Sequence, residues 1–332
     1  MRNSRVVLSA LGGPEVLKLI DDDVPGPGPN EVRIRVLACG IAFADVLMRR
    51  GLYSGVPRLP YSPGYDIVGT VESCGAAVTQ WRPGDQVTAL TQTGGYSRFI
   101  VLPESELLKV PEGQDPANAV SLVLNYTTAY QLLHRIANLQ PNERVLIHGA
   151  AGGVGTAALQ LGSIAGLKMF GTASKPKHGL VTSLGGIPID YRREDFVRRA
   201  AGVDAVFDPI GGRNWPRSYS ALRKGGRFVG YGMSAAIENG HTNKMLAVTS
   251  FAWLGLAKMF PGKSARWYSI TTEKKKRFEW FQEDLSRLLS MLQQGSIRPV
   301  IAEKLPLRDA PRAHELLEHS SVTGKIVLLC QE

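Results

Sequence analysis

A glycine-rich turn near the middle of the chain constrains the fold more than any other feature. Residues 145–148 form an apolar strand pattern and run directly into Gly149-Ala150-Ala151-Gly152-Gly153-Val154-Gly155, where an apolar helix begins. Ala150, Gly152 and Gly155 occupy the three small-residue positions of the dinucleotide-binding fingerprint, with alanine in place of the first glycine. A pyrophosphate must approach backbone N–H groups at a helix start, where a Cβ atom would collide. We expect residues 150–155 to bind this group; the alternative is a tight turn without a ligand.

The chain after this turn alternates between strand and helix patterns, which supports the first interpretation. A helix is predicted at 155–167, residues 234–272 are irregular and apolar, and an amphipathic helix is predicted at 278–294. Strands are predicted at 144–148, 169–173, 187–190, 205–210, 227–231 and 326–329. Such alternation indicates a doubly wound parallel sheet of the Rossmann type.

The first third of the chain has a different pattern, of short strands separated by turns. These strands are predicted at 6–10, 31–38, 66–73, 86–90 and 96–102, and helical periodicity begins near Pro116. The pattern is typical of an irregular β-barrel or sandwich. The simplest architecture is a β-rich domain at 1–122 and 273–332, interrupted by a dinucleotide-binding domain at 123–272.

The residues after the second strand of the parallel sheet predict the cofactor. A site that prefers NAD usually has Asp or Glu near position 174, which accepts from the ribose 2′-hydroxyl and repels a 2′-phosphate. This chain has Ser174, followed by Lys175 and Lys177. We therefore predict NADPH, with Ser174 and Lys177 on the 2′-phosphate and Tyr191 beside it. The alternative for the two lysines is a solvated loop.

Charge, cysteine content and hydropathy exclude several other classes of function. The formal charge of +10 favours anionic partners, but the basic residues are dispersed and accompany no nucleic-acid-reading motif, so nucleic acid is not expected. Three distant cysteines provide neither a disulfide framework nor metal-ligand spacing. The N-terminus does not resemble a signal peptide, and the longest apolar run, 247–260, falls short of the ~20 residues that span a membrane. We expect a soluble, cytoplasmic protein.

Motifs along nearly the whole chain resemble the zinc-free quinone oxidoreductase group of the medium-chain dehydrogenase/reductase superfamily, closest to its vesicle amine transport protein-like branch. The matching stretches are Phe43-Ala44-Asp45, Arg50-Gly51-Leu52-Tyr53, Ser62-Pro63-Gly64, Asn125 to Tyr130, Leu139-Gln140-Pro141, Ala150 to Gly155, Gly171 to Ser174, Lys177-His178, Ile189-Asp190-Tyr191, Asp208 to Gly212 and Tyr231-Gly232-Met233.

The resemblance implies a GroES-like catalytic domain around the Rossmann domain, and a homodimer. It implies that Tyr53 hydrogen-bonds or protonates the substrate, as a tyrosine does in related enoyl reductases; the alternative is aromatic packing. Asp45 falls in the same catalytic region, with a structural cap or salt bridge as its alternative. Thr128 is similar to a residue that approaches the nicotinamide, and Tyr231 and Gly232 fall in a further matching cofactor motif.

The zinc ligands of related alcohol dehydrogenases are missing from this sequence. Where those enzymes place a Cys-His pair and a Gly-His-Glu, this chain has Ala42-Phe43 and Gly64-Tyr65-Asp66. Too few thiolate, imidazole and carboxylate ligands remain for zinc, so no metal is expected. His314 and His319 are five residues apart, which suits a solvated C-terminal helix better than a metal site, and His148 is expected to be structural.

A nicotinamide site without a metal requires an acceptor that is already electrophilic. Quinones and α,β-unsaturated carbonyls meet this condition, so the expected substrate is a small hydrophobic carbonyl or quinone. Many relatives have Asn where this chain has Ala42, a departure that implies altered substrate choice or low activity. The alternative function is a lipid-binding or membrane-associated interaction protein, because residues 245–260 are apolar and 274–277 are basic. For the apolar stretch we favour a lid or a dimer contact.

Overall fold

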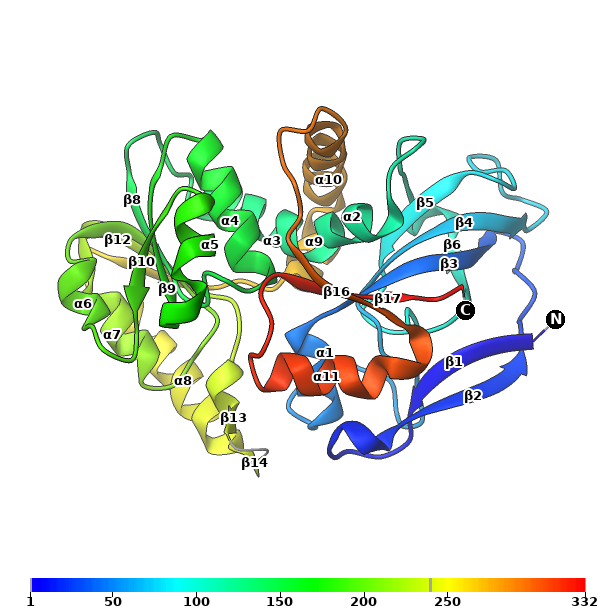
Figure 1. Cartoon of the computed structure of the whole chain (residues 1–332), viewed down its shortest axis with the longest axis horizontal. Helices are drawn as coiled ribbons and strands as arrows, with labels where there is room; N and C mark the ends of the chain where they lie inside the picture. The colour runs from blue at the N-terminus through cyan, green and yellow to red at the C-terminus, as the bar shows by residue number, and fades with distance from the viewer. Residues whose placement is uncertain (1, 239–240, 332) are drawn as a thin grey trace. The chain divides into compact units, whose positions relative to one another are not determined.

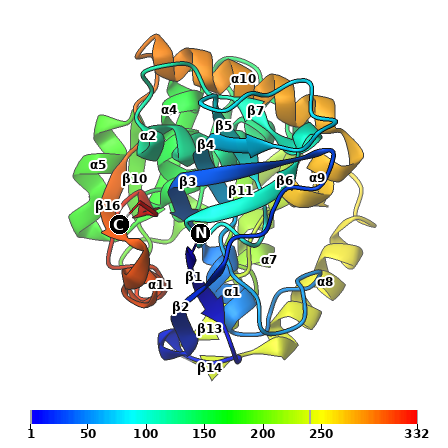
Figure 2. The same ribbon diagram turned by 90° about the vertical axis from the view of Figure 1, so that its right-hand side faces the viewer.

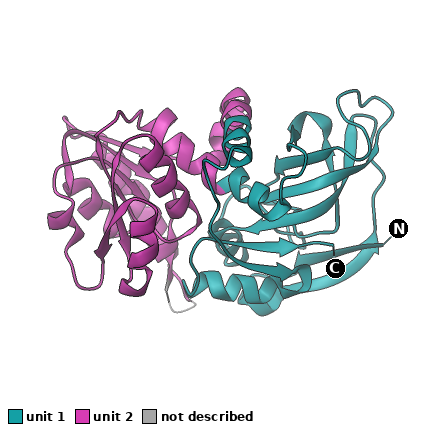
Figure 3. Cartoon of the chain, turned by 45° about the horizontal axis from the view of Figure 1, so that its top comes forward, with its two compact units in different colours: residues 1–124, 285–332 teal, residues 125–284 magenta. Residues whose placement is uncertain are grey.

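The computed structural model describes residues 2–238 and 241–331, which divide into two compact units (Figure 3). Unit 1 comprises Met1–Leu124 and Leu285–Glu332, and unit 2 comprises Asn125–Asp284. The second division falls inside helix α10 (Phe278–Gln293), later than the 272/273 boundary expected from sequence. The first part of α10 belongs to unit 2 because Asp284 accepts hydrogen bonds from Gln131 Nε2 at 2.9 Å and from Arg135 Nη2 at 2.8 Å.

Unit 2 contains a six-stranded parallel sheet in the order β10-β9-β8-β11-β12-β15, which confirms the predicted doubly wound α/β fold. Its strands are β8 (Arg144–Ile147), β9 (Lys168–Ala173), β10 (Gly186–Asp190), β11 (Val203–Asp208), β12 (Leu222–Gly230) and β15 (Ser264–Trp267). The strand order reverses between β8 and β11, and ligands of such sheets bind at the carboxyl ends of the strands beside this reversal.

Helices cover both sides of this sheet. Figure 1 shows α4 and α5 on one side and α6 and α7 on the other. The helices of unit 2 are α3 (Thr127–Tyr130), α4 (Gly153–Ile164), α5 (His178–Ser183), α6 (Phe196–Arg199), α7 (Asn214–Ser220), α8 (Lys244–Ala257) and α9 (Ile270–Lys276). A two-residue β13 (Ile237–Glu238) pairs with β14 (His241–Thr242).

The prediction that 234–272 is irregular is wrong, because this segment contains α8, β15 and the start of α9. Strand β15 pairs with β12 at the edge of the sheet, and of its four residues Ala265 is the buried one. An edge strand with one buried side chain has no alternating pattern that sequence could reveal.

Unit 1 is rich in β-structure, as predicted. Its seven-stranded sheet has the order β16-β17-β3-β4-β5-β7, with β6 also paired to β3, and a separate hairpin joins β1 and β2 (Figure 2). The strands are β1 (Arg2–Leu8), β2 (Leu17–Asp23), β3 (Glu31–Ile41), β4 (Asp66–Cys74), β5 (Gln86–Leu90), β6 (Phe99–Pro103), β7 (Leu108–Lys109), β16 (Ile301–Pro306) and β17 (Lys325–Leu329). The helices are α1 (Phe43–Arg49), α2 (Pro116–Ser121) and α11 (Ala310–Glu318).

The core of unit 1 is apolar and includes Val32, Ile34, Val36, Ile67 and Val87, all fully buried. Val32, Ile34 and Val36 alternate along β3, so they lie on one face of the sheet, which is removed from water. No helix in the described part of the chain has both the length and the hydropathy that crossing a bilayer requires.

The prediction that His314 lies on a solvated helix is wrong. This residue lies on α11 and is fully buried, while His319 is exposed at the helix end. His314 Nε2 hydrogen-bonds to the Tyr96 hydroxyl at 3.0 Å, and its Nδ1 accepts from Arg49 Nε at 3.3 Å. Burial and the Arg49 charge lower the pKa of His314 to about 3, so its imidazole is neutral and structural.

Candidate active site

The phosphate turn joins β8 to α4 by a backbone path that only small residues allow. Gly149 has φ of +65°, in the left-handed region. The Ala150 N–H donates to the Thr172 carbonyl at 3.0 Å, which ties the turn to β9. A Cβ atom on Gly155 would lie 2.3 Å from the Gly149 carbonyl oxygen, so this glycine is needed to close the turn.

Gly152 and Gly153 differ in what requires them to be glycine. A Cβ on Gly153 would lie 2.0 Å from Nδ2 of the buried Asn125, so packing excludes a side chain there. Gly152 has ordinary extended angles, φ −84° and ψ 179°, and among the described residues the nearest atom to its Cβ position is the Gly149 oxygen at 3.3 Å. Protein packing therefore leaves room at Gly152 for a ligand that a side chain would displace.

The start of α4 suits an anion. This helix has 12 residues, and its N-cap Gly152 has no side chain to satisfy the first N–H groups. The aligned peptide dipoles place partial positive charge there. Val154, half-buried in the first turn, completes the segment 150–155. These residues fit the pyrophosphate of a dinucleotide.

A buried polar network fixes the strand ends beneath this turn. His148, which follows β8, hydrogen-bonds through Nδ1 to the Thr172 hydroxyl at 3.0 Å and through Nε2 to the Ser218 hydroxyl at 2.9 Å. Ser218 Oγ donates to Asp208 Oδ2 at 2.6 Å. Because Thr172 lies on β9 and Asp208 ends β11, the network joins the carboxyl ends of the three strands β8, β9 and β11. This agrees with the structural role predicted for His148.

The residues predicted to contact a 2′-phosphate follow two paired strands. Ala173 ends β9 opposite Asp190 of β10, so the next residues, Ser174 and Tyr191, lie at the same edge of the sheet. Lys177 is the last residue of the following 3-10 turn, Lys175–Lys177, and is half-buried. Its burial lowers the pKa of the ammonium group. Tyr191 is 53% exposed, with the Arg192 guanidinium 5.7 Å from its ring centre.

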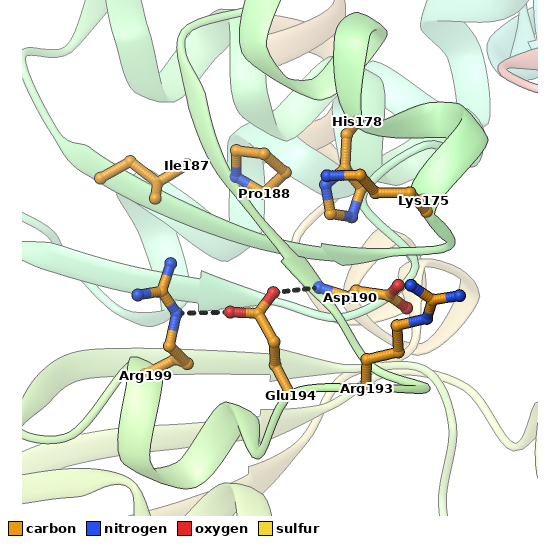
Figure 4. A pocket seen from close by; sticks show the side chains of 8 residues that line it. All are labelled: Lys175, His178, Ile187, Pro188, Asp190, Arg193, Glu194 and Arg199. Carbon is orange, nitrogen blue, oxygen red and sulfur yellow. Dashed lines mark hydrogen bonds and ion pairs between the residues drawn. The ribbon is translucent and has the colours of Figure 1, made fainter.

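A pocket of about 400 Å³ opens beside these residues (Figure 4). Within it Arg199 pairs with Glu194 at 2.8 Å, and Glu194 accepts from the Asp190 N–H at 2.9 Å. The remaining lining residues are Lys175, His178, Ile187, Pro188 and Arg193. Arg193 adds positive charge that sequence reasoning missed, although the run Tyr191-Arg192-Arg193 was visible.

Thr128, Tyr231 and Gly232 lie elsewhere in unit 2. Tyr231 follows β12, and its N–H donates to the Asp208 carbonyl at 3.1 Å; a Cβ on Gly232 would lie 2.9 Å from the Pro209 carbonyl oxygen. Both therefore lie by the carboxyl end of β11. Thr128 is buried on α3 and hydrogen-bonds to the Tyr268 hydroxyl.

In unit 1, the catalytic candidate Asp45 is fully buried. Its Oδ2 accepts from the Ala42 N–H at 2.8 Å, which caps α1, and its Oδ1 accepts from the Gly64 N–H at 3.2 Å. Burial raises the pKa of this carboxyl to about 7, although the two N–H groups oppose the shift. Each carboxyl oxygen of Asp45 therefore accepts a hydrogen bond from a backbone N–H group, and neither oxygen is exposed to solvent.

The other catalytic candidate, Tyr53, pairs with a second tyrosine. The Tyr53 and Tyr65 hydroxyl oxygens lie 2.7 Å apart, and their rings meet edge to face at 85°. Tyr53 is half-buried, whereas Tyr65 is 2% exposed. In the sequence, Tyr65 was considered only as the residue that replaces a histidine of the zinc enzymes. Its position directly after Gly64, near the predicted donor Tyr53, could have indicated a role in the site.

No group of three or more His, Cys, Asp or Glu side chains that could hold a metal ion occurs within residues 2–238 and 241–331. Asp66 follows Tyr65 at the place of the glutamate in the zinc enzymes. It forms a buried ion pair with Lys325, at 3.1 Å between Oδ2 and Nζ.

This chain belongs to the medium-chain dehydrogenase/reductase superfamily of oxidoreductases, as the matching families and relatives show, and its doubly wound sheet, phosphate turn and β-rich unit are consistent with that class. The alcohol dehydrogenase GroES-like domain family matches residues 28–112, and the zinc-binding dehydrogenase family matches residues 186–328.

Individual relatives confirm the resemblance found in the sequence. The chain is 34% identical to the human synaptic vesicle membrane protein VAT-1 homolog, over 98% of this chain and 86% of that protein. It is 35% identical to the rat quinone oxidoreductase, over 96% of this chain and 95% of the relative. The crystal structure of Escherichia coli quinone oxidoreductase complexed with NADPH superposes with a TM-score of 0.88 and 30% identity, covering 98% of this chain and 99% of the other.

Proposed function

We propose that this chain is an NADPH-dependent reductase of quinones or α,β-unsaturated carbonyls that transfers a hydride without a metal ion. One observation carries the proposal: the phosphate turn at the switch point of the sheet lies beside a strand end with a serine and lysines where an NAD site has a carboxylate. The similarity to a quinone oxidoreductase that binds NADPH supports the same assignment.

The residues of unit 2 would hold the cofactor in three parts. The N–H groups around Gly152 at the start of α4 bind the pyrophosphate, with Ala150, Gly153, Val154 and Gly155 shaping the turn. Ser174 and Lys177 bind the 2′-phosphate, with Tyr191 at the same strand edge. The family resemblance assigns Thr128 to the nicotinamide, and a further matching motif assigns Tyr231 and Gly232 to the cofactor. When bound, NADPH supplies the hydride.

Tyr53 would complete the reaction by donating a proton to the substrate. Hydride addition to a ring carbon or β-carbon leaves negative charge on the carbonyl oxygen of the acceptor. A tyrosine hydroxyl is protonated at neutral pH and can donate to that oxygen. Asp45 then serves the reaction indirectly, because it holds Gly64 and the first turn of α1 in place.

The test is NADPH oxidation, followed by absorbance, across naphthoquinones, enones and enoyl thioesters with the wild-type chain and with Tyr53→Phe. We expect wild-type turnover of at least one quinone or enone. For an enone, Tyr53→Phe should lower kcat by about 10- to 100-fold, because a general acid contributes on this scale, with NADPH affinity unchanged. Consumption of no acceptor would reject the function, and unchanged turnover in Tyr53→Phe would leave Tyr53 a packing residue.

A second candidate function is binding to acidic lipid surfaces with little catalysis. The exposed apolar side chains of α8, among them Met245 and Val248, favour it, together with the basic end of α9 at 274–276. Flotation with vesicles that contain acidic lipid, combined with failure to oxidise NADPH with every acceptor, would select this function over the reductase.

A further inference from the structure

The hydroxyl pair formed by Tyr53 and Tyr65 has one half-buried member and one buried member. Each tyrosine hydroxyl has a single proton to donate and can accept a bond in return, so within the pair one hydroxyl donates and the other accepts. The oxygens are 2.7 Å apart, a normal distance for this bond. Because Tyr53 is half-buried and Tyr65 is 2% exposed, Tyr53 is the partner whose proton can point outward.

Tyr65 is held by its backbone. Its carbonyl oxygen accepts from the Thr91 N–H at 3.0 Å and from the Gln92 N–H at 3.1 Å. The preceding Gly64 donates to Asp45 and adopts φ of +113°, and a Cβ there would lie 2.5 Å from the Tyr96 nitrogen. The segment that carries Tyr65 therefore cannot shift easily, whereas Tyr53 lies in the turn that follows Gly51.

We propose that Tyr65 is a positioning residue for the reduction. Its hydroxyl donates to the Tyr53 oxygen, which directs the Tyr53 proton toward the acceptor and stabilises the negative oxygen that remains after the proton leaves. This inference rests on the proposed function, in which Tyr53 is the proton donor.

Bound NADPH would supply the hydride that adds to the acceptor carbon, while the Tyr53 O–H bond breaks and an O–H bond forms on the substrate. Tyr53 is left as a phenolate and accepts the Tyr65 hydrogen bond. A proton from water then restores Tyr53, and Tyr65 keeps its own proton throughout.

The Tyr53 oxygen becomes negatively charged when its proton leaves. A hydrogen bond to a charged oxygen is about twice as strong as one between neutral groups, so the Tyr65 bond strengthens as the proton leaves. Interactions that strengthen in the transition state raise kcat rather than ground-state binding. Tyr65→Phe should therefore lower kcat by about tenfold, with little change in the KM for NADPH.

The test is a double-mutant cycle with Tyr53→Phe, Tyr65→Phe and the double variant, on the best enone found for the wild type. If Tyr65 acts through Tyr53, the double variant will be no slower than Tyr53→Phe alone. The solvent deuterium isotope effect on kcat should also rise in Tyr65→Phe, because proton transfer becomes slower; a purely structural role would not move it.

The matched control is Tyr61→Phe. Tyr61 is also buried in unit 1, four positions before Tyr65, and its hydroxyl has no hydrogen-bond partner within the described residues. This variant should keep wild-type turnover, and melting temperatures of all variants verify that each is folded.

The outcomes separate the two hypotheses. If Tyr53→Phe keeps wild-type turnover, the donor role in the proposed function fails and the Tyr65 inference fails with it. If Tyr53→Phe is slow but Tyr65→Phe is not, or if the two losses multiply in the double variant, only the role of Tyr65 is overturned.

Discussion

At the scale of single residues, the cofactor preference depends on the charges beside two strand ends. Ser174 follows β9, and Lys177 lies in the next turn with part of its side chain buried, which lowers the pKa of the ammonium group. A cation that has lost some of its water interacts more strongly with a phosphate than a fully solvated one does. Lys177 is therefore the residue on which the choice of NADPH should depend most.

Lys177→Glu tests this choice. The new carboxylate repels a 2′-phosphate and can accept from a ribose hydroxyl, so the KM for NADPH should rise by at least about tenfold, the effect of roughly 1.4 kcal/mol. The KM for NADH should change little or fall. Steady-state kinetics with both cofactors measure the difference; equal effects would remove Lys177 from the 2′-phosphate site. Lys168→Glu, on the exposed start of β9, controls for the change in net charge.

Asp45 makes the stability of the protein depend on pH. Its pKa is about 7 in the folded chain, above the ordinary value of an aspartate, so the folded state holds a proton that the unfolded state has lost. The stabilising contribution is complete below about pH 4 and is lost as the pH rises through about 7. Each unit of pKa difference corresponds to about 1.4 kcal/mol.

The measurement compares melting temperatures of the wild type and Asp45→Asn between pH 4 and 8. The variant cannot titrate at this position, so the advantage of the wild type over the variant should shrink steadily as the pH rises. An advantage that stays constant, or that grows with pH, would show that this carboxyl is ionised in the folded chain at neutral pH.

Single residues differ in whether their role depends on local sequence or on the tertiary fold. The phosphate turn could be found because its glycines are consecutive and their function is local. The Tyr53–Tyr65 hydrogen bond and the His314 network could not, because each joins residues brought together only by the tertiary fold. A solvated helix was expected for His314 because its spacing from His319 does not suit a metal site, yet Tyr96 and Arg49 hydrogen-bond to it inside the core.

At the scale of elements, strands whose side chains are nearly all buried could be predicted from the sequence. All six residues of β11 are buried, and β5 is buried from its second residue onward; both were located from sequence. Among the strands that were missed, β2, β7, β15 and β16 each bury a single residue and β14 buries none. Strands that contribute little to a core carry no hydrophobic periodicity, so hydrogen bonding to a neighbour decides their structure.

At the scale of the whole molecule, helix α8 and the residues after it leave an apolar surface in water. Phe251 packs against Trp215 and Trp267, with ring centres 6.0 and 5.1 Å away. Other side chains remain exposed: Met245, Val248, Leu256, Met259 and Phe260. Contiguous apolar surface of this kind marks a contact site on soluble proteins. We predict that this surface, which lies next to the edge strand β15, forms the contact of the homodimer that the family resemblance implies.

Sedimentation at micromolar concentration tests this assembly. The wild type should sediment as a dimer, and Val248→Glu should weaken dimerisation by at least about tenfold, because a charge would be buried without a partner. Leu19→Lys, which alters an exposed apolar residue on β2 of unit 1, should have no effect. A monomeric wild type would contradict a dimer contact at α8.

The place of β17 in its sheet determines when each half of the molecule can form during synthesis. Because β6 pairs with residues 31–35 and β17 with residues 38–41 on the same edge of β3, the part of that edge at 38–41 stays open until β17 has been synthesised. All six strands of the other sheet lie within one uninterrupted stretch of sequence and are complete by Trp267. The dinucleotide half can therefore fold first, while the exposed edge of β3 is the segment that a chaperone would need to protect from aggregation.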